Sequence, residues 1–458
     1  MIKTLAWAVL LLMTLAPVAH ADDAEEISRH RHLRAIEALP PGAGDESLQQ
    51  FADEHLAPAY RDSFAPGKLM ELLRSIRMAG ANAGGILYGR SGDWARVRFI
   101  GEKGETPVAF RMQPVVPYLI VELKLEPAVE GERGANVPPI TWESLQDRLD
   151  EEAKSGFSGA VCVVRDGKVV LSRGYGLANR DKKISNDEYT IFAIGSTPID
   201  FTRAAVLKLE DMGKLKTSDA ITKYLKDVPA DKQGMTIDQL MSGRSGLANF
   251  HHVRGVDADP DLTWIDRDTA VRRILGGKLL FAPGTEHAHS HSAWVLLAAI
   301  VERVSGKSYG DFVETELFAP AGMTRTHLHE GLVRFKDDEI AIGYDAGSFG
   351  AVNSPKYWGR TSWLVMGSGG MASTPDDLFR FVSAVYGAKL FSRAAAQKYG
   401  SSGNVLVGGD DRGFLCMHAE KGGDMFFLCS NAHTGPGDHA SAVGKELARM
   451  VLGAPAGN

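Results

Sequence analysis

Ser196 carries a hydroxyl that could act as a nucleophile if a base lay beside it. It ends the segment Phe192-Ala-Ile-Gly-Ser196, directly before a helical pattern that begins at Pro198. A serine hydroxyl is a weak nucleophile until a base takes its proton. Ile199, three residues further on, cannot accept a proton. The local sequence therefore gives Ser196 no evident base.

The same segment can also be interpreted as the start of a helix. Thr197 is a favoured N-cap residue, Pro198 suits the first helical position, and Asp200 would meet free amide groups in the first turn. These residues predict a capped helix over 198–212 whether or not Ser196 reacts.

Histidines offer an alternative base. His289 lies in His289-Ser290-His291, and imidazole titrates near neutral pH. A Ser196–His289 dyad is one hypothesis, with His291 or an unidentified acid orienting the base. The other is that both imidazoles are polar side chains without a catalytic role, because no residue is visibly placed to set the tautomer.

The same histidines allow a metal hypothesis. His287, His289 and His291 alternate, and His251-His252 could lie nearby. Alternating imidazoles on a strand would share one face and could bind zinc. Spacing without geometry is weak evidence, and no GxGxxG motif leads from a strand into a helix, so we expect neither a metal nor another cofactor.

Composition limits the class of protein. The chain has 458 residues, 44% of them hydrophobic and 24% charged, which is typical of two or three globular domains. A net charge of -6 shows no basic excess, so nucleic acid is not an expected partner.

The three cysteines do not form a metal or redox motif. Two strands, 414–420 and 425–431, are predicted around the turn Gly422-Gly423. In that register Cys416 faces Cys429. Either a cross-strand disulfide or two reduced thiols would fit, and Cys162 would be a free thiol in both cases.

Residues 1–21 have the pattern of a signal peptide. Lys3 precedes an apolar run, and Ala19-His20-Ala21 is a small-residue cleavage site. We expect an exported protein, periplasmic or secreted, whose mature chain starts at Asp22 and has no membrane span.

Two further regions follow. Residues 22–138 are expected to form a small α+β domain, with helices at 46–54 and 67–78 and strands at 83–88, 94–100, 106–112 and 118–125. This arrangement loosely resembles cystatin or NTF2 folds. A linker rich in Glu, Gly and Pro, residues 126–139, precedes the domain at 139–458, where strands near both ends flank a mostly helical middle. One antiparallel sheet built from both termini, with a helical insertion, is therefore predicted.

The second region resembles the serine beta-lactamase family in its broad sense, which includes penicillin-binding-protein-like carboxypeptidases and esterases. The resemblance covers roughly 140–452 and rests on ordered blocks. They include Phe192-Ala-Ile-Gly-Ser196, Phe281-Ala-Pro-Gly-Thr285, Phe318-Ala-Pro-Ala-Gly-Met323 and Gly369-Gly-Met-Ala-Ser-Thr-Pro-Asp-Asp-Leu378. The resemblance implies an α+β fold with a helical subdomain, Ser196 at the nucleophile position, and a loop rather than a strand at His287–His291.

Three motifs that the family uses are altered here. Ile199 replaces the Lys of Ser-x-x-Lys, His289-Ser290-His291 replaces Tyr-x-Asn, and Val407 with Gly409 stands where Lys or His-x-Gly is expected. We therefore expect a catalytically inactive homologue that serves as a binding or regulatory module. Its cleft would be lined by Ser196, Ile199, His289, His291 and Gly409, and its ligand would be a small acyl, ester or peptidoglycan-type peptide compound. The alternatives are a hydrolase that uses Ser196 with His289 and a metal-binding histidine cluster; protein partners are unknown.

Overall fold

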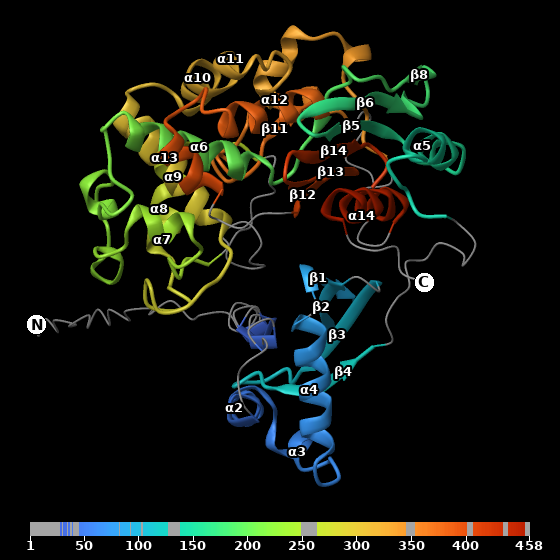
Figure 1. Ribbon diagram of the computed structural model, residues 1–458. Helices are drawn as coiled ribbons and strands as arrows, with labels where there is room; N and C mark the ends of the chain where they lie inside the picture. The colour runs from blue at the N-terminus through green and yellow to red at the C-terminus, as the bar shows by residue number, and fades with distance from the viewer. Residues whose placement is uncertain are drawn as a thin grey trace, which may run out of the picture.

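Figure 1 shows the fold in a computed structural model of the chain. The structure describes residues 28–29, 31–33, 35–36, 39, 45–81, 83–91, 93–101, 104–126, 138–248, 263–344, 353–400, 406–433 and 438–453. The predicted signal peptide and most of the predicted linker lie outside these residues. None of the described helices is both long enough and apolar enough to cross a membrane.

The N-terminal unit packs helices on one face of an antiparallel meander. The helices are α2 (Asp45–His55), α3 (Pro58–Arg61) and α4 (Lys68–Ala81), and the strands are β1 (Ala83–Ser91), β2 (Trp94–Gly101), β3 (Gly104–Met112) and β4 (Ile120–Leu125). The strands pair in chain order. Alternate residues Val97 and Phe99 of β2 and Val108 and Phe110 of β3 are fully buried in one core, which is the alternation seen in the sequence. The resemblance to cystatin or NTF2 folds stays a prediction.

Two buried histidines join the helices of this unit to its sheet. The Nδ1 atoms of His32 and His55 are 2.9 Å apart, and Nε2 of His32 is 2.9 Å from the carbonyl oxygen of Tyr118. A carbonyl only accepts, so His32 donates through Nε2 and accepts at Nδ1 from His55. Burial lowers the pKa of His32 to about 4 and that of His55 to about 3, so both rings are neutral at pH 7.

We expect acid to destabilise this unit selectively. Both folded pKa values lie below the ordinary value of 6.5, so the unfolded chain takes up protons first and stability falls as the pH drops from about 6.5 towards 4. Two protons give a slope of up to about 2.7 kcal/mol per pH unit. Hydrogen exchange of β2 to β4 amides at several pH values measures it. The double variant His32→Leu/His55→Phe should lose the slope, whereas His289→Gln, at an exposed position, should keep it.

The second unit is built on a five-stranded antiparallel sheet. Its strands are β5 (Gly159–Arg165), β6 (Lys168–Tyr175), β12 (Leu406–Asp411), β13 (Phe414–Lys421) and β14 (Asp424–Ser430), in the order β12-β13-β14-β5-β6. Chain segments from both ends of the unit therefore meet at the β14–β5 pair, where Phe427 faces Cys162. The α+β fold with a sheet built from both termini is confirmed.

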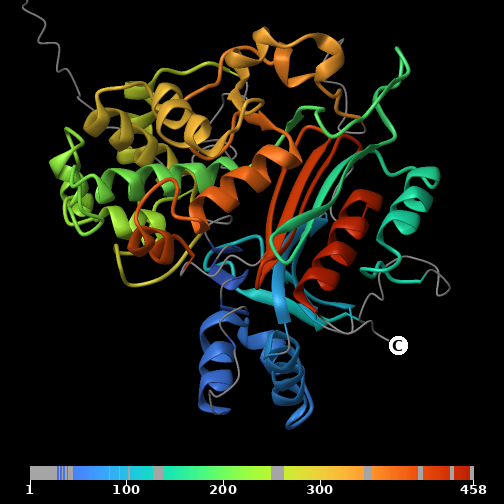
Figure 2. The same ribbon diagram turned by 45° about the horizontal axis from the view of Figure 1, so that its top comes forward.

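The two faces of this sheet carry separate cores. Along β5, Cys162 and Val164 point into the core shared with the helical region, and Val161 and Val163 point into the core on the opposite face. All four side chains are buried, so β5 is covered on both sides and reads as one continuous apolar run. Figure 2 shows the helices on both sides of the sheet.

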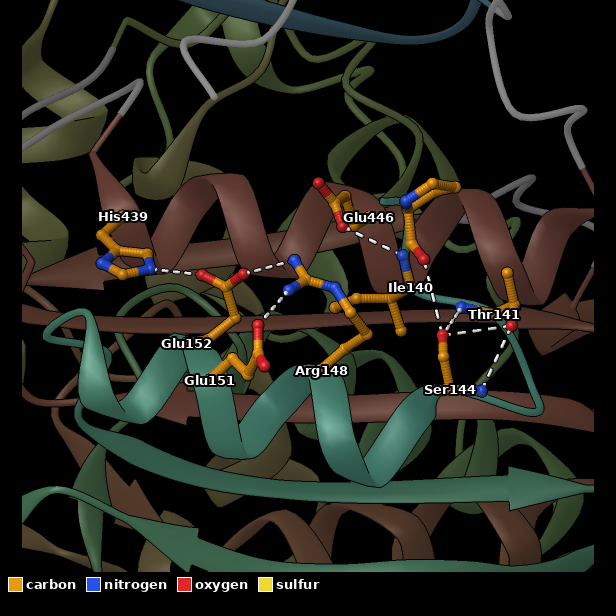
Figure 3. A network of polar contacts seen from close by, with 9 residues as sticks. Ile140, Thr141, Ser144, Arg148, Glu151, Glu152, His439 and Glu446 are labelled. Carbon is orange, nitrogen blue, oxygen red and sulfur yellow. Dashed lines mark hydrogen bonds and ion pairs between the residues drawn. The ribbon is translucent and has the colours of Figure 1, made fainter. Parts of the chain in front are cut away.

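Helices α5 (Leu145–Lys154) and α14 (His439–Leu452) cover the face that Val161 and Val163 line. Figure 3 shows the polar contacts that join them. Glu152 of α5 lies 2.7 Å from Nη2 of Arg148 and 2.5 Å from Nε2 of His439 at the start of α14, and Glu446 accepts from the amide of Ile140. This network fixes the first and last helices of the unit to each other, on the face of the sheet turned away from α6.

The other face carries the helical region. Its helices are α6 (Pro198–Asp211), α7 (Ile237–Met241), α8 (Arg267–Gly276), α9 (His291–Ser305), α10 (Tyr309–Val313), α11 (Ala319–Ala321), α12 (Pro375–Tyr386) and α13 (Arg393–Gly400). Short strands β7 (Leu177–Asn179) and β8 (Ile184–Ser185) form a hairpin, and β9 (Phe192–Ala193), β10 (His327–Leu328) and β11 (Met371–Ser373) form a small sheet in the order β10-β11-β9. Strand β9 leads directly to Ser196.

Candidate functional site

Ser196 lies in a turn between β9 and α6. Strand β9 is held by pairing with β11, and the amide of Ile194 donates to the carbonyl of Met371. Gly195 then takes a φ of +51°, a left-handed backbone that favours glycine and turns the chain into the helix. Ser196 is half-buried, and its hydroxyl makes no hydrogen bond to any residue that the structure describes.

Ile199 stands one turn into α6 and is half-buried against the hydrophobic core of the helical region. The sec-butyl side chain of isoleucine can neither take the proton of a hydroxyl nor stabilise a charge near it. The position from which a lysine amine would activate Ser196 is thus apolar in three dimensions as well as in sequence.

The capping role predicted for Thr197 is wrong. Thr197 precedes the first helical residue, but its own backbone is helical, at φ -56° and ψ -29°, and its side chain caps no amide. Its hydroxyl is buried without a hydrogen-bond partner. The reason is geometric: a capping side chain needs an extended backbone to reach back to the helix amides, and the turn through Gly195 has already set Thr197 in the helix.

Strand β12 lies against the backbone of Ser196. A Cβ atom built on Gly409 would be 2.5 Å from the amide nitrogen of Ser196 and 2.6 Å from the carbonyl oxygen of Ile194. Only glycine allows this approach. The structure thus brings together Ser196, Ile199 and Gly409, and the register places Val407 opposite His418, two residues before Gly409. We call Ser196, Ile199 and Gly409 together the Ser196 site.

A buried polar cluster lies one helical turn below Ser196, and sequence reasoning missed it. Asp200 is 5% exposed and forms an ion pair of 3.3 Å with Arg203, which is 7% exposed. The guanidinium of Arg203 lies over the rings of Trp294 at 5.5 Å and Tyr399 at 5.8 Å. The spacing of Asp200 and Arg203, three apart on one helix face, is the signal that could have indicated an ion pair.

Strand β13 completes this cluster. Tyr386 donates a hydrogen bond to Glu420, and burial raises the pKa of that carboxyl above its ordinary value. His418 is buried, its ring stacks on Phe427 at 5.4 Å, and its Nδ1 atom has no hydrogen-bond partner. Burial lowers the pKa of His418. Asp200 is thus paired with Arg203 and Glu420 with the Tyr386 hydroxyl, and none of these groups is hydrogen-bonded to Ser196.

A loop that contains Gly367 also holds α6. Thr202 donates to the carbonyl of Gly367 at 2.6 Å, and its hydroxyl is 2.6 Å from that of Tyr309. Gly367 has a φ of +80°, and a Cβ there would be 2.8 Å from the carbonyl oxygen of Trp294. These contacts fix the first turns of α6, and with them the position of Ser196.

His289 and His291 lie at the start of α9, and the structure does not join either of them to Ser196. Their rings are 4.9 Å apart and nearly perpendicular, and His289 is exposed. Ser290, between them, is the N-cap of α9 and accepts from the amide of Ala293. The predicted loop before the helix is confirmed, but the geometry gives no Ser196–His289 hydrogen bond.

The histidine metal hypothesis gains no support from the described part of the chain. No group of three or more potential ligand residues is placed to hold a metal ion there. His287 lies against Gly243, where a Cβ would be 2.8 Å from its Nε2 atom. His251 and His252 lie outside the described residues.

Comparison with known proteins identifies the family. The Beta-lactamase family model matches residues 145–444, from α5 to the middle of α14. The chain therefore belongs to the beta-lactamase family. The N-terminal unit lies outside the matched segment.

Individual relatives agree with this assignment. The putative penicillin-binding protein PbpX of Bacillus subtilis is 31% identical over 251 residues, which are 54% of this chain and 60% of that protein. The octameric penicillin-binding protein homologue from Pyrococcus abyssi has a TM-score of 0.56 at 21% identity, over 69% of this chain and 78% of that one. The D-amino acid amidase from Ochrobactrum anthropi has a TM-score of 0.56 at 21% identity, over 68% and 97% of the two chains. The solved structures share the fold, and the chain spans only about 60% of the length of PbpX.

Proposed function

We propose that this chain is an exported, non-hydrolytic member of the beta-lactamase family that binds a small acyl or peptide ligand at the Ser196 site. One observation carries the proposal: the hydroxyl of Ser196 has no hydrogen-bond partner among the described residues, and Ile199 occupies the position one turn on. Without a base, attack of a serine hydroxyl on an ester or amide is slow. The chain retains the family fold, so the site can still bind a ligand after its catalytic activity has been lost.

Covalent labelling tests the absence of catalysis. We expect the purified chain, incubated with a fluorophosphonate and with a fluorescent penicillin, to carry no adduct at Ser196 by mass mapping. A serine hydrolase with an intact Ser-x-x-Lys motif, treated in parallel, shows that the probes react. An adduct that forms steadily on the wild type and is lost in Ser196→Ala would disprove the proposal, and loss of that adduct in His289→Ala as well would establish the Ser–His dyad instead.

The chemistry of the site also limits the ligand. Neither of two α6 side chains close to Ser196 in the chain is a free cation that could bind a carboxylate: Ile199 is apolar, and Arg203 is paired with Asp200 at 3.3 Å. The residue type two positions before Gly409 is Val407 rather than Lys or His. Penicillin-binding relatives and a D-amino acid amidase of the same fold favour compounds with an amide group as the ligand class. We therefore propose that neutral, amide-terminated ligands bind better than free acids.

Calorimetric titration with N-acetyl-D-alanyl-D-alanine and with its C-terminal amide checks this preference. We expect the amide to bind at least roughly tenfold more tightly, a difference of about 1.4 kcal/mol. Ile199→Lys, which places a cation at the site, should narrow or reverse the ratio. A wild-type preference for the free acid would contradict the proposed ligand class while leaving the labelling result untouched.

Export is proposed from residues 1–21 alone. Cell fractionation followed by N-terminal mass analysis should find the mature chain outside the cytoplasm, beginning at Asp22. A cytoplasmic chain that retains Met1 would contradict this part of the proposal.

A further inference from the structure

The central sheet carries two buried thiols that face each other across neighbouring strands. The thiols combine a covalent chemistry with a structural link to the Ser196 site. Cys416 of β13 and Cys429 of β14 are direct partners in the antiparallel register. Their sulfur atoms are 3.7 Å apart, and both side chains are fully buried.

We propose that Cys416 and Cys429 are a disulfide site, oxidised as the protein folds in an oxidising compartment, and that this bond fixes the part of the sheet that supports Ser196. In the structure all three cysteines are free thiols. The proposal rests on the proposed export only for the source of the oxidant.

The position of the pair in the sheet gives the bond its consequence. Gly409 of β12 is the register partner of Cys416, Cys416 that of Cys429, and Cys429 that of Ala160 on β5. These four residues form one row across four strands. The row ends at Gly409, whose missing side chain makes room for the backbone of Ser196. A bond between Cys416 and Cys429 would prevent β13 and β14 from sliding relative to each other at this row.

A small disulfide such as oxidised glutathione can oxidise the two thiols. One cysteine, as its thiolate, attacks oxidised glutathione, forms a mixed disulfide and releases one glutathione thiolate. The second cysteine then attacks the protein-bound sulfur, the Cys416–Cys429 bond forms, and a second glutathione leaves. The two protein thiols lose two protons and two electrons, and one glutathione disulfide becomes two thiols.

Burial decides when this can happen. Burial raises the pKa of Cys429 well above its ordinary value, so the packed protein holds little of the reactive thiolate. The exchange therefore belongs to folding, while the β13–β14 hairpin is still accessible. Gly422 and Gly423 at its turn, with φ values of +60° and +99°, set the register locally and bring the two cysteines opposite each other early. After packing, the same burial shields the bond from reductants.

Cys162 is the internal control. It is also fully buried, but it lies opposite Phe427, two residues along β14 from Cys429, and it faces neither member of the pair in the register. Burial raises its pKa to about 12. The proposal therefore predicts one specific bond and one remaining thiol.

The test refolds the full chain with reduced and oxidised glutathione, denatures it and alkylates the free thiols before mass mapping. We expect one alkylated cysteine, Cys162, and a linked Cys416–Cys429 peptide; Cys162→Ala should leave no thiol to alkylate. Three alkylated cysteines, or a bond that includes Cys162, would overturn the proposal. Because the oxidant is added, the result does not depend on export or on catalysis.

Two further measurements test the consequence. Reduction under unfolding conditions and refolding in dithiothreitol should lower the midpoint of thermal unfolding by roughly 5–10 °C. The reason is that a bond closing the segment from Cys416 to Cys429 removes conformational freedom from the unfolded chain. Cys416→Ala/Cys429→Ala should show no such shift. Hydrogen exchange over 406–416 should be several-fold slower in the oxidised protein, and equal rates would refute the link to Ser196.

Discussion

Replacing Asp200 with asparagine is expected to lower the free energy of unfolding of the family domain by about 3–5 kcal/mol. Asp200 and Arg203 form an ion pair at 3.3 Å, with side chains 7% and 9% exposed. Removing the carboxylate charge leaves a buried guanidinium that lies over the aromatic rings of Trp294 and Tyr399, where little solvent can compensate for the loss. Urea denaturation followed by tryptophan fluorescence measures the change.

A matched exposed pair separates this effect from the general loss of a helix acid. Asp376 in the first turn of α12 pairs with Arg380 at 2.8 Å, but these side chains are 27% and 50% exposed. Asp376→Asn should therefore cost no more than about 1 kcal/mol. The double variant Asp200→Asn/Arg203→Met should be clearly less destabilised than the sum of the two single variants. Additive single effects would show that the pair is not coupled.

The parts of this fold that local sequence determines were predictable. The Asp166-Gly167 turn, with φ values of +49° and +73°, joins β5 to β6 as expected, and the Gly422-Gly423 turn puts Cys416 opposite Cys429. In a two-residue hairpin the turn fixes the register, and the register fixes every facing pair. The same locality made the helix at α6 predictable to within one residue.

The parts that depend on contacts between distant segments were not predictable. The cluster below Ser196 takes Asp200 from α6, Tyr386 from the end of α12, Tyr399 from α13 and Glu420 from β13, and no sequence spacing relates these four residues. The capping prediction for Thr197 was wrong for a related reason. Its residue type favours a cap, but the turn set by Gly195 gives Thr197 a helical backbone. Tertiary constraint overrode a sound local preference.

Replacing Gly409 with alanine is the second variant with a large expected effect. The added carbon would lie 2.5 Å from the amide nitrogen of Ser196 and 2.6 Å from the carbonyl oxygen of Ile194. Main-chain atoms cannot rotate away as a flexible side chain can, so β12 and the turn at Ser196 must separate. We expect a loss of about 3 kcal/mol, at the upper end of what overpacking costs, and a loss of ligand binding at the site.

Gly276→Ala is the control for the removal of a glycine. Gly276 ends α8, and a Cβ there would meet no atom within 4 Å. Alanine at that position should leave stability unchanged or raise it by up to about 1 kcal/mol, because the unfolded chain loses freedom. If Gly409→Ala were as stable as Gly276→Ala, β12 would not lie against Ser196 in solution. In that event, the absence of a side chain at position 409 would say nothing about the ligand, and the proposed link from Cys416 through Gly409 to Ser196 would have no physical path.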